Sequence, residues 1–475
     1  MKILVVGAGG REDALGWALA GGREAAGLAG GSPEVWFYPG NAGTERWGQN
    51  VHLGDEGDEE QAALTGWARE AGIELVVVGP EAYLWAGLAD RLRAVGILTF
   101  GPGQAGARLE ASKAWAKEFM QRHRIPTARS RTFGRTERAE AVRFVQESGH
   151  PWVVKADGLA AGKGVTVCET VAETVAAVER LLGERELGAA GEQVVLEERM
   201  YGPEVSLLAI TDGTAVAILP EAQDHKRIGE GDTGPNTGGM GAYSPVPFFT
   251  PAIRRRVVET IILPTIAGLQ QEGIDYRGVI YAGLMLTEDG PRVVEFNCRF
   301  GDPETQAILP RLPDVDWGAL FAATAAGQLR TYLQETCPVA GRMEDEESAA
   351  GSRAGVTPIP CWTLRAGEGA VVDVVLAMEG YPGSYRRGVV VSGFESVTSL
   401  PQAIIFHGGT QRLPAGGPIV TTGGRVLHVV GIGPTLADAR DQAYQAAAGI
   451  RFEGKYLRRD IGEQALAWKA GTHKA

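Results

Sequence analysis

Residues 152–167 read WVVKADGLAAGKGVTV, in which an apolar stretch runs into a glycine-rich loop and then into a second apolar stretch. Aromatic and β-branched residues at 152–154 predict a buried strand. The loop contains two lysines and three glycines: Lys155, Lys163, Gly158, Gly162 and Gly164. Glycine lets the backbone approach a bound group closely, and free N–H groups in such a loop converge on an anion. The stretch therefore predicts a phosphate-binding loop, with an ordinary glycine hairpin as the alternative.

The loop differs from a P-loop in two ways. GLAAGK has three residues between its glycines where a P-loop has four, and Gly164 stands where Ser or Thr would hold magnesium. The lysines support phosphate binding, because the chain has 46 lysines and arginines of which only nine are lysine. Five of these nine lie in glycine-rich or motif-like stretches: Lys113, Lys117, Lys155, Lys163 and Lys226. A compact ammonium on a flexible stem can follow a moving phosphoryl group.

Length and composition indicate a globular enzyme. A chain of 475 residues with 44% hydrophobic residues should form about three domains. The formal net charge of -12 disfavours nucleic acid or an anionic membrane as the main partner, although a local basic pocket remains open. Four cysteines without CxxC spacing fit a reducing compartment and a chain without structural zinc. No apolar run reaches the ~20 residues of a membrane span. The apolar run at the N-terminus, in KILVVGAGGRE, is too short for a signal peptide. We expect a cytoplasmic monomer without membrane or nucleic-acid partners.

Residues 1–103 alternate strand-like and helical stretches, with helices expected over 12–20 and 59–71. This alternation predicts a parallel sheet with helices on its faces. Ligands of such sheets bind outside the carboxyl ends of the strands, where this chain has Gly9, Gly10, Arg11, Asn41 and Glu81. GAGGRE lacks the last glycine of GxGxxG because Glu12 stands there. We favour a phosphorylated small molecule over NAD, with a plain structural turn as the alternative.

The next stretches predict a helix and a small α/β unit. Residues 109–122 are amphipathic at helical spacing, with an apolar stripe that belongs to the core. Residues 125–198 contain the glycine loop, a helix expected over 171–182 and a buried strand QVVLEE. That strand ends in Glu197 and Glu198, which face either a ligand or solvent. Glu204 begins the following predicted strand, within reach of the same cleft.

Residues 224–241, DHKRIGEGDTGPNTGGMG, hold six glycines in 18 residues. A flexible linker is the simple interpretation, but a linker does not need clustered charges. Long loops inside compact domains are often functional. We predict a loop without regular structure that brings Asp224, Lys226, Arg227 and Asn236 over a ligand.

Residues 293–304, VVEFNCRFGDPE, predict a strand that lines a cavity. Side chains alternate along a strand, so Glu295, Asn297 and Arg299 should point to one face. Glu295 and Asn297 offer the oxygen ligands that magnesium prefers, and Arg299 is a fork for a carboxylate or phosphate. An exposed edge strand would show the same alternation.

The last part of the chain predicts a smaller α+β domain. Several strand-like stretches precede a helix expected over 436–450. Residues 338–369 include MEDEESAAGSRAG, which is polar and predicts an exposed or disordered insertion. His407 and His428 lie in apolar strands, where a structural histidine is the favoured interpretation over a catalytic one.

Motifs along nearly the whole chain resemble those of the phosphoribosylamine-glycine ligases, in order and spacing: GAGGREDAL, PGNAGT, VGPE, LEASKAWAKEFM, VVKADGLAAGKGV, QDHKRIGEGDTGPNTGGMGAYSP, YAGLML, VVEFNCRFGDPETQ, GYPGSY, FHGGT and IRFEGKYLRRDIG. The resemblance implies an ATP-grasp enzyme of purine biosynthesis that joins glycine to 5-phosphoribosylamine and cleaves ATP to ADP and phosphate. It implies an N-terminal α/β substrate domain over 1–103, an ATP-grasp domain over 104–330 and an α+β domain over 331–475. A lid-like subdomain would cover 125–198.

Together, motif and residue pattern assign four groups of site residues. The ATP contacts are Lys113, Lys155, Gly162, Lys163, Gly164, Glu197, Glu198, Met200 and Glu204. The substrate contacts are Gly9, Gly10, Arg11, Glu12, Asn41, Gly43, Glu81, Asn236, Gly239 and Arg299. The metal ligands, for Mg²⁺ or Mn²⁺, are Glu295 and Asn297. The catalytic residues are Lys155, Asp224, Lys226 and Arg299. Asp13 and Tyr83 depart from the usual His and Pro of the family, which weakens the resemblance at the sugar-phosphate crevice.

The implied chemistry suits these residues. A carboxylate does not acylate an amine at neutral pH unless it is first phosphorylated, and phosphoryl transfer needs positioning and charge neutralisation. The acyl phosphate, here glycyl phosphate, must be shielded from water, which fits two glycine-rich lids. A carboxyaminoimidazole ribonucleotide synthase is one alternative, but it should lack DHKRIGEGDTGPNTGGMG. A non-catalytic nucleotide-binding protein is another, and the set of Lys155, Glu295, Asn297 and Arg299 argues against it.

Overall fold

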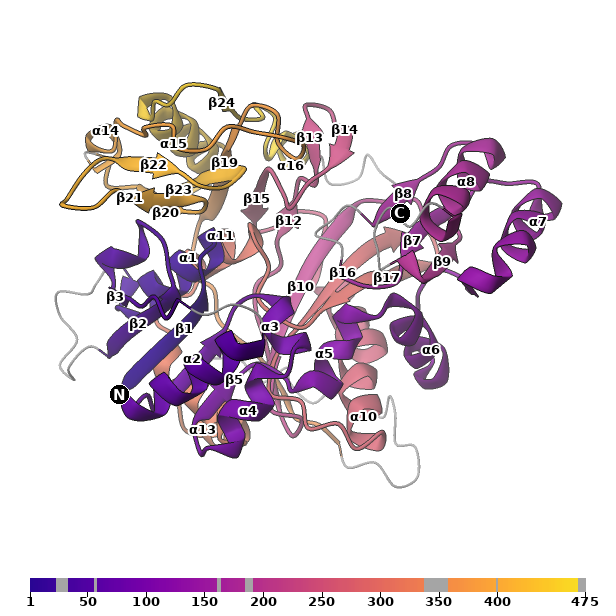
Figure 1. Cartoon of the computed structure of the whole chain (residues 1–475), viewed down its shortest axis with the longest axis horizontal. Coiled ribbons are helices and arrows are strands. Elements are labelled where there is room, and N and C mark those ends of the chain that lie inside the picture. Colours follow the sequence, from indigo (N-terminus) through magenta and orange to yellow (C-terminus); the bar gives the residue numbers. More distant parts are fainter. Residues whose placement is uncertain are drawn as a thin grey trace.

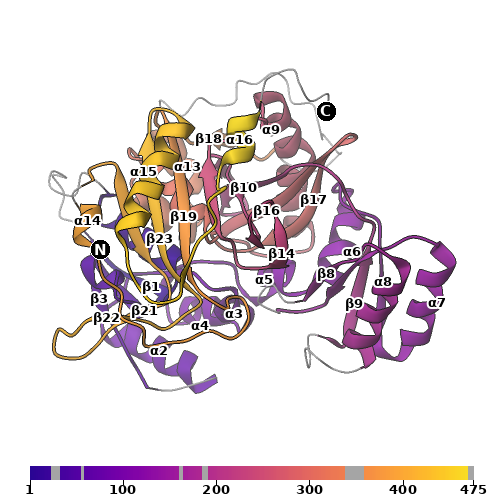
Figure 2. The ribbon, with the colours of Figure 1, turned by 90° about the horizontal axis from the view of Figure 1, so that it is seen from above.

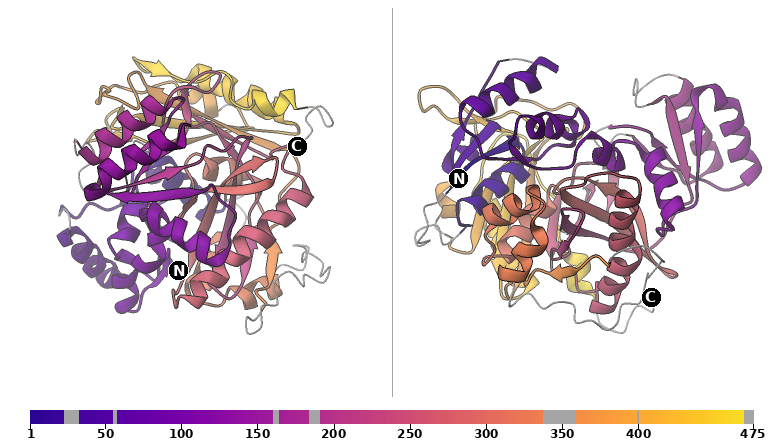
Figure 3. Two further views of the ribbon diagram at one scale, coloured as in Figure 1. Left: turned by 90° about the vertical axis from the view of Figure 1, so that its right-hand side faces the viewer. Right: turned by 90° about the horizontal axis from the view of Figure 1, so that it is seen from below.

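The computed structural model describes residues 1–22, 33–54, 58–159, 164–183, 191–336, 358–398 and 400–468. Four sheets of four or more strands organise these residues, together with two hairpins of two strands each (Figure 1). The smallest of the four sheets, with two helices, projects from one side of the molecule, as Figures 2 and 3 show. The predicted boundaries at 103/104 and 330/331 remain a proposal.

The N-terminal sheet is parallel, in the order β3-β2-β1-β4-β5. Its central strand KILVVG is buried after its first residue, as expected of a parallel strand covered on both faces. The predicted α/β arrangement is confirmed. The elements are β1 (Lys2–Gly7), α1 (Gly10–Leu19), β2 (Glu34–Pro39), η2 (Thr44–Arg46), β3 (Gln49–Asn50), α2 (Asp58–Glu70), β4 (Leu75–Val78), α3 (Glu81–Trp85), α4 (Leu88–Ala94) and β5 (Leu98–Phe100).

The helix predicted over 109–122 is two helices, α5 (Gln104–Ala111) and α6 (Lys113–His123). Ser112 takes an extended conformation between them, and its side chain accepts a hydrogen bond from the Trp115 N–H at 3.1 Å. Serine is a favoured N-cap, so it starts a new helix here. The predicted apolar stripe is nevertheless buried: Leu109, Trp115, Phe119 and Met120.

The projecting subdomain contains an antiparallel sheet in the order β6-β9-β7-β8. It has a hydrophobic cluster of its own, which includes Phe133, Trp152 and Leu196. The predicted helix over 171–182 is α8 and continues as one π-helical turn. The elements are β6 (Ser130–Gly134), η3 (Arg135–Glu137), α7 (Arg138–Ser148), β7 (Val153–Ala156), β8 (Val165–Val167), α8 (Val171–Val178), η4 (Glu179–Gly183) and β9 (Gln193–Glu197).

The central sheet has the order β17-β16-β10-β11-β18. Residues 338–369 were predicted to form an exposed or disordered insertion, and strand β18 shows that part of this prediction is wrong. Strand β18 pairs in parallel with β11. Residues 337–357 lie outside the described ranges. The elements are β10 (Glu204–Thr211), β11 (Val216–Ile218), α9 (Pro251–Val257), η6 (Val258–Ile262), α10 (Leu263–Gln271), β16 (Gly278–Thr287), β17 (Gly290–Asn297), α11 (Glu304–Ile308), η7 (Leu309–Arg311), α12 (Trp317–Ala325), α13 (Leu329–Thr336) and β18 (Cys361–Thr363).

The last sheet has the order β12-β15-β19-β23-β20, with β24 also paired to β19. Strands β12 and β15 precede strands β16 and β17 of the central sheet in sequence, whereas β19, β20, β23 and β24 follow them. Two distant parts of the chain therefore share this sheet. The elements are β12 (Gln223–Asp224), β15 (Gly241–Ser244), β19 (Ala370–Met378), α14 (Glu395–Thr398), β20 (Ala403–His407), β21 (Thr410–Arg412), β22 (Ile419–Thr421), β23 (Arg425–Gly433), α15 (Leu436–Gly449), β24 (Lys455–Tyr456) and α16 (Glu463–Ala467).

The prediction that residues 224–241 lack regular structure is wrong. Strands β13 (Arg227–Gly229) and β14 (Thr233–Asn236) form a hairpin between β12 and β15. Left-handed backbone at Gly231 and Asp232 makes the reversal possible. The buried Arg458 donates to the Arg227 carbonyl at 2.9 Å and contacts Asp232 at 2.8 Å, so the last part of the chain fastens this hairpin.

Candidate active site

A buried carboxylate at the end of β9 holds two lysines. Glu197 lies 3.0 Å from the Lys155 ammonium and 3.0 Å from the Lys117 ammonium. Lys155 also donates to the Val294 carbonyl of β17 at 3.0 Å, and Lys117 donates to Thr127 Oγ1 at 2.8 Å. Burial lowers the pKa of Lys117 to about 8, against the attraction of Glu197. One carboxylate therefore orients two cations between the projecting sheet and the central sheet.

The glycine loop after β7 is fastened to the start of α6. The Asp157 carboxylate accepts from the Ser112 hydroxyl at 3.2 Å and from the Ala114 N–H at 3.0 Å. A carboxylate is favoured at this positive end of a helix. Lys113 donates to the Gly158 carbonyl at 3.2 Å, and burial lowers the pKa of Lys113. The first lysine of α6 and the start of the glycine loop thus meet.

Two predicted phosphate contacts, Gly162 and Lys163, lie outside the described residues. Gly164 follows that gap, and its carbonyl accepts from the Ala156 N–H at 2.7 Å. This bond closes the turn between β7 and β8, so the strand–loop–strand arrangement of the sequence prediction is present.

Carboxylates from strands β10 and β17 meet the ammonium of Lys226, which lies between β12 and β13. Lys226 Nζ lies 2.8 Å from Glu204 Oε2 and 3.7 Å from Glu295 Oε1. Burial acts to raise the pKa of Glu295, but Lys226, Lys155 and Lys113 outweigh it and lower that pKa. Glu295 is therefore ionised and available as a ligand at neutral pH.

The donor set on β17 fits a magnesium-type cation. Glu295 offers a carboxylate and Asn297 an amide oxygen, and magnesium commonly takes one or two protein ligands and fills its shell with water and phosphate oxygens. Among the residues that the structure describes, no group of three or more His, Cys, Asp or Glu is arranged to hold a metal. The further ligands would therefore come from a bound phosphate chain and water.

Arg299 reaches the site from beyond the strand, so the prediction that it continues the strand face is wrong. Strand β17 ends at Asn297, because the Cys298 N–H donates at 2.8 Å to Glu110 instead of to a neighbouring strand. The Arg299 guanidinium lies 2.9 Å from Glu110 and 3.2 Å from Glu81. It also donates to Asn297 Oδ1 at 3.2 Å. The carboxylates of Glu110 and Glu81 thus hold the Arg299 guanidinium beside strand β17, at the edge of the N-terminal domain.

Backbone groups at the start of α1 are bonded to carboxylates in this structure. The Gly9 N–H donates to Glu12 Oε2 at 2.6 Å, and the Arg11 N–H donates to Asp302 Oδ2 at 3.2 Å. The Arg11 side chain pairs with Glu12 at 2.6 Å. The N–H groups that the sequence predicted as phosphate contacts are therefore bonded to Glu12 and Asp302 in this structure.

Asn41 and Gly43 connect the same crevice to the last sheet. Asn41 Nδ2 donates to the His407 carbonyl at 2.8 Å, and its Oδ1 accepts from the Gly43 N–H at 2.7 Å. A Cβ atom on Gly43 would lie 2.1 Å from the Asp13 carboxylate, so only glycine fits. These residues shape the crevice by joining two domains.

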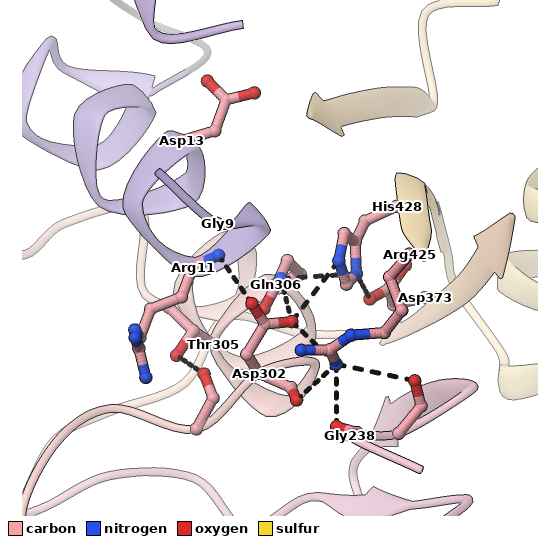
Figure 4. A network of polar contacts seen from close by, with 12 residues as sticks. Gly9, Arg11, Asp13, Gly238, Asp302, Thr305, Gln306, Asp373, Arg425 and His428 are labelled. Atoms are coloured by element: carbon pink, nitrogen blue, oxygen red, sulfur yellow. Dashed lines mark hydrogen bonds and ion pairs between the residues drawn. The ribbon is translucent and has the colours of Figure 1, made fainter. Parts of the chain in front are cut away.

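The two departures from the family pattern have partners of their own, and Asp13 also lies against Gly43. The buried Asp13 accepts from Trp47 Nε1 at 2.6 Å and pairs with Arg46 at 2.8 Å. In Figure 4 its side chain lies apart from the groups around Gly9. The Tyr83 hydroxyl donates to Glu60 at 2.6 Å. Neither side chain displaces the predicted contacts at the start of α1.

Other predicted residues are not brought to the lysine cluster. Glu198 is 38% exposed and lies 3.8 Å from Arg129. Arg227 donates to the Gly234 carbonyl inside the hairpin at 2.7 Å, opposite Asn236. For Met200 the structure shows only a half-buried residue after β9.

Two further predicted residues lie near the site in different settings. Burial raises the pKa of Asp224 well above its ordinary value, against the nearby charge of Lys226. Gly239 has a left-handed φ of 112°, and a Cβ atom there would lie 2.3 Å from the Pro303 ring. Asp224 thus lies among the charges of Lys226, Glu204 and Glu295, whereas Gly239 allows two loops to pack closely.

The residue patterns missed several carboxylates of the site. Glu110 bridges Arg299 and the Cys298 N–H. Glu304 is buried and accepts from Tyr281 at 2.5 Å and from Ser206 at 3.0 Å. The motifs LEASKAWAKEFM and GDPE contained them, but their roles depend on contacts with strands far away in sequence.

Family models of phosphoribosylglycinamide synthetase match the chain in three successive parts. The N domain matches residues 1–110, the ATP-grasp (A) domain 111–305 and the C domain 371–464. The chain belongs to this family. It is an ATP-grasp ligase, so it binds ATP and uses a divalent metal, and the predicted resemblance is confirmed.

Curated relatives agree over nearly the full length. A phosphoribosylamine–glycine ligase of Nostoc sp. is 46% identical over 465 residues, which cover 97% of this chain and 99% of that protein. The human trifunctional purine biosynthetic protein adenosine-3 is 42% identical over 98% of this chain, but the match covers 42% of the human protein. The region that matches this chain is thus part of a longer protein there.

Solved structures show the same architecture. The crystal structure of phosphoribosylamine–glycine ligase from Thermotoga maritima matches with a TM-score of 0.76 and 33% identity, over 97% of this chain and 100% of that one. A biotin carboxylase domain from Hydrogenobacter thermophilus matches at 0.65 with 16% identity, over 96% and 91% of the two chains, which shows a shared fold alone. Within the described residues, every helix is too short or too polar to cross a bilayer.

Proposed function

We propose that this protein joins glycine to 5-phosphoribosylamine, with ATP cleaved to ADP and phosphate, through glycyl phosphate in purine biosynthesis. One observation carries the proposal. Arg299 lies between strand β17, which carries Glu295 and Asn297, and the crevice at the start of α1, and its guanidinium is held by Glu110 and Glu81. A guanidinium fork in that place can bind the glycine carboxylate between ATP and the amine that attacks it. Family membership supports the same reaction.

The roles of the site residues follow from their contacts. Lys113, Lys155 and the glycine loop with Lys163 would bind the ATP phosphates, with Glu197 orienting Lys155. Glu295 and Asn297 would hold Mg²⁺ or Mn²⁺, which would neutralise charge on the ATP phosphates when bound. Lys226, held by Glu204, would neutralise charge on the transferring phosphoryl group. The start of α1, with Asn41 and Gly43 beside it, would bind phosphoribosylamine.

The reaction balances in two steps. A glycine carboxylate oxygen attacks the γ-phosphorus of ATP, and the bond to ADP breaks, so that glycyl phosphate forms. The amine of phosphoribosylamine then attacks the glycyl carbonyl carbon and loses a proton, while phosphate leaves with the original carboxylate oxygen. Preorganised cations lower the barrier of the first step, because phosphoryl transfer depends on positioning and charge.

An isotope experiment tests this mechanism. Glycine labelled with oxygen-18 in its carboxylate should transfer one labelled oxygen to each released phosphate, with one ADP and one amide formed. Omission of phosphoribosylamine should abolish sustained phosphate release, and replacement of glycine by alanine should reduce it strongly. Unlabelled phosphate at full turnover would overturn the acyl phosphate route. We also propose that the protein works as a cytoplasmic monomer, which light scattering with and without substrates tests.

A further inference from the structure

His428 of β23 lies buried between two carboxylates from different elements. Its Nδ1 lies 2.8 Å from Asp373 Oδ2 of β19, and its Nε2 lies 3.3 Å from Asp302 Oδ1 in the loop before α11. His428 is 1% exposed and Asp373 is 0% exposed. Figure 4 shows the imidazole between these carboxylates, with Arg425 and Gln306 beside it. The predicted structural histidine thus has a charged environment on both ring nitrogens.

The charges around the ring favour the imidazolium. With both carboxylates ionised, Asp302 and Asp373 carry two negative charges, and Arg425, 3.2 Å from Asp302, supplies one positive charge. Arg11 also acts on Asp302, but its charge is paired with Glu12 at 2.6 Å. A protonated His428 balances the group, whereas a neutral ring leaves one buried negative charge, which is costly. Gln306 donates to Asp302 at 3.0 Å and adds no charge. Burial disfavours the imidazolium, but Asp373 and Asp302 outweigh it and raise the pKa of His428.

The same network touches the start of α1. Asp302 Oδ2 accepts from the Arg11 N–H at 3.2 Å, while its Oδ1 faces His428 and Arg425. The His428 ring also packs on Gly10, since a Cβ atom there would lie 2.4 Å from the ring. The ring therefore supports both the helix turn and the carboxylate that bonds to it.

We propose that protonated His428 is a positioning residue, which fixes Asp302 against the first turn of α1 and thereby sets the affinity of the crevice for phosphoribosylamine. This inference rests on the proposed function, because it takes the start of α1 as the sugar-phosphate site. It assigns a reaction-related role to the last sheet, which lies outside the ATP machinery. The affinity for the sugar phosphate should therefore fall as the pH rises and His428 loses its proton, whereas the KM for ATP should not.

Ribose 5-phosphate is a suitable probe, because it keeps the sugar and phosphate without the amine. We would measure its Kd by calorimetry on the full chain from pH 7 to 9.5, above the second phosphate pKa of roughly 6. The wild type should bind about tenfold more weakly at pH 9.5, the scale on which one charge-assisted contact acts. His428→Asn should bind weakly at every pH, with a flat profile.

Two variants separate positioning from a general role in folding. Asp373→Asn keeps an acceptor for the ring but removes its charge, so the pH midpoint should shift to lower pH while the tightest binding is retained. His123→Asn is the control, because His123 ends α6 and contacts Glu272 at 2.8 Å, away from the start of α1. Its profile should equal that of the wild type.

The outcomes distinguish this inference from the proposed function. A pH profile that His428→Asn and Asp373→Asn leave unchanged would overturn the positioning role, as would ribose 5-phosphate that does not bind the wild type at all. Failure of the wild type to release phosphate with glycine, ATP and phosphoribosylamine would instead overturn the proposed reaction.

Discussion

Replacement of Glu197 by Gln should destabilise the protein in a pH-dependent way. The Glu197 carboxylate contacts Lys117 and Lys155, and all three side chains are 4–6% exposed. Removal of one partner from a buried ion pair costs about 3–5 kcal/mol, because it leaves a charge without compensation. We expect a loss of free energy of unfolding of that order at pH 7.

Lys117 can relieve part of this loss by releasing its proton. Its pKa in the folded protein is about 8, against an ordinary value of 10.5. Neutralising it at pH 7 costs about 1.4 kcal/mol, and above pH 8 the wild type releases the same proton. Since the folded state binds fewer protons than the unfolded state between these two pKa values, wild-type stability rises with pH there. In Glu197→Gln the attraction that keeps Lys117 protonated is gone, so Lys117 is already neutral at pH 7 and the stability of the variant rises over the whole range from pH 7 to pH 9. The wild type gains stability only above pH 8, so the difference between wild type and variant should narrow by about 1.4 kcal/mol from pH 7 to pH 9.

Urea unfolding at both pH values measures this difference. Glu198→Gln is the control, because the neighbouring carboxylate is 38% exposed and lies 3.8 Å from an arginine. Such a pair contributes roughly 0–1 kcal/mol, so the control should unfold nearly as the wild type does. Equal losses for Glu197→Gln at pH 7 and pH 9, or unfolding like that of the control, would refute the buried triad of charges.

Three further changes test the site. Glu295→Ala should abolish turnover and leave the unfolding midpoint unchanged; near wild-type activity at saturating magnesium would contradict its role as a ligand. Arg299→Lys should raise the KM for glycine or lower kcat by about tenfold or more, because an ammonium cannot reproduce the bidentate contact, and unchanged glycine kinetics would make the residue structural. Cys298→Ala should retain turnover, since burial raises the pKa of this thiol well above its ordinary value and keeps it from acting as a nucleophile; an inactive, folded variant would argue for covalent chemistry.

Local patterns predicted what depends on local chemistry. The alternation of strands and helices before residue 103, the glycine loop between two strands and the position of Glu204 at a strand start all follow from periodicity and turn residues. These features are formed by neighbours in sequence, so the sequence contains the information directly.

Predictions failed where distant contacts decide the outcome. Arg299 leaves the strand because Glu110, 188 residues earlier than Cys298, accepts the next backbone N–H. The segment 224–241 is a fastened hairpin because Arg458, more than 200 residues later, bonds to its backbone. Composition indicated flexibility there, but tertiary contacts with the end of the chain override it.

The pairing of β15 with β19 makes the central and last domains difficult to separate. Residues 241–244 bond to residues 371–374, so a chain ended near residue 330 would leave β15 as an open edge with free N–H and C=O groups. The apolar strand β11 would also lose β18. Exposed strand edges promote pairing between chains, so such a fragment is expected to aggregate when expressed alone. In a longer polypeptide, the unit that must stay intact therefore extends through the last sheet, and a fusion should not interrupt it before that point.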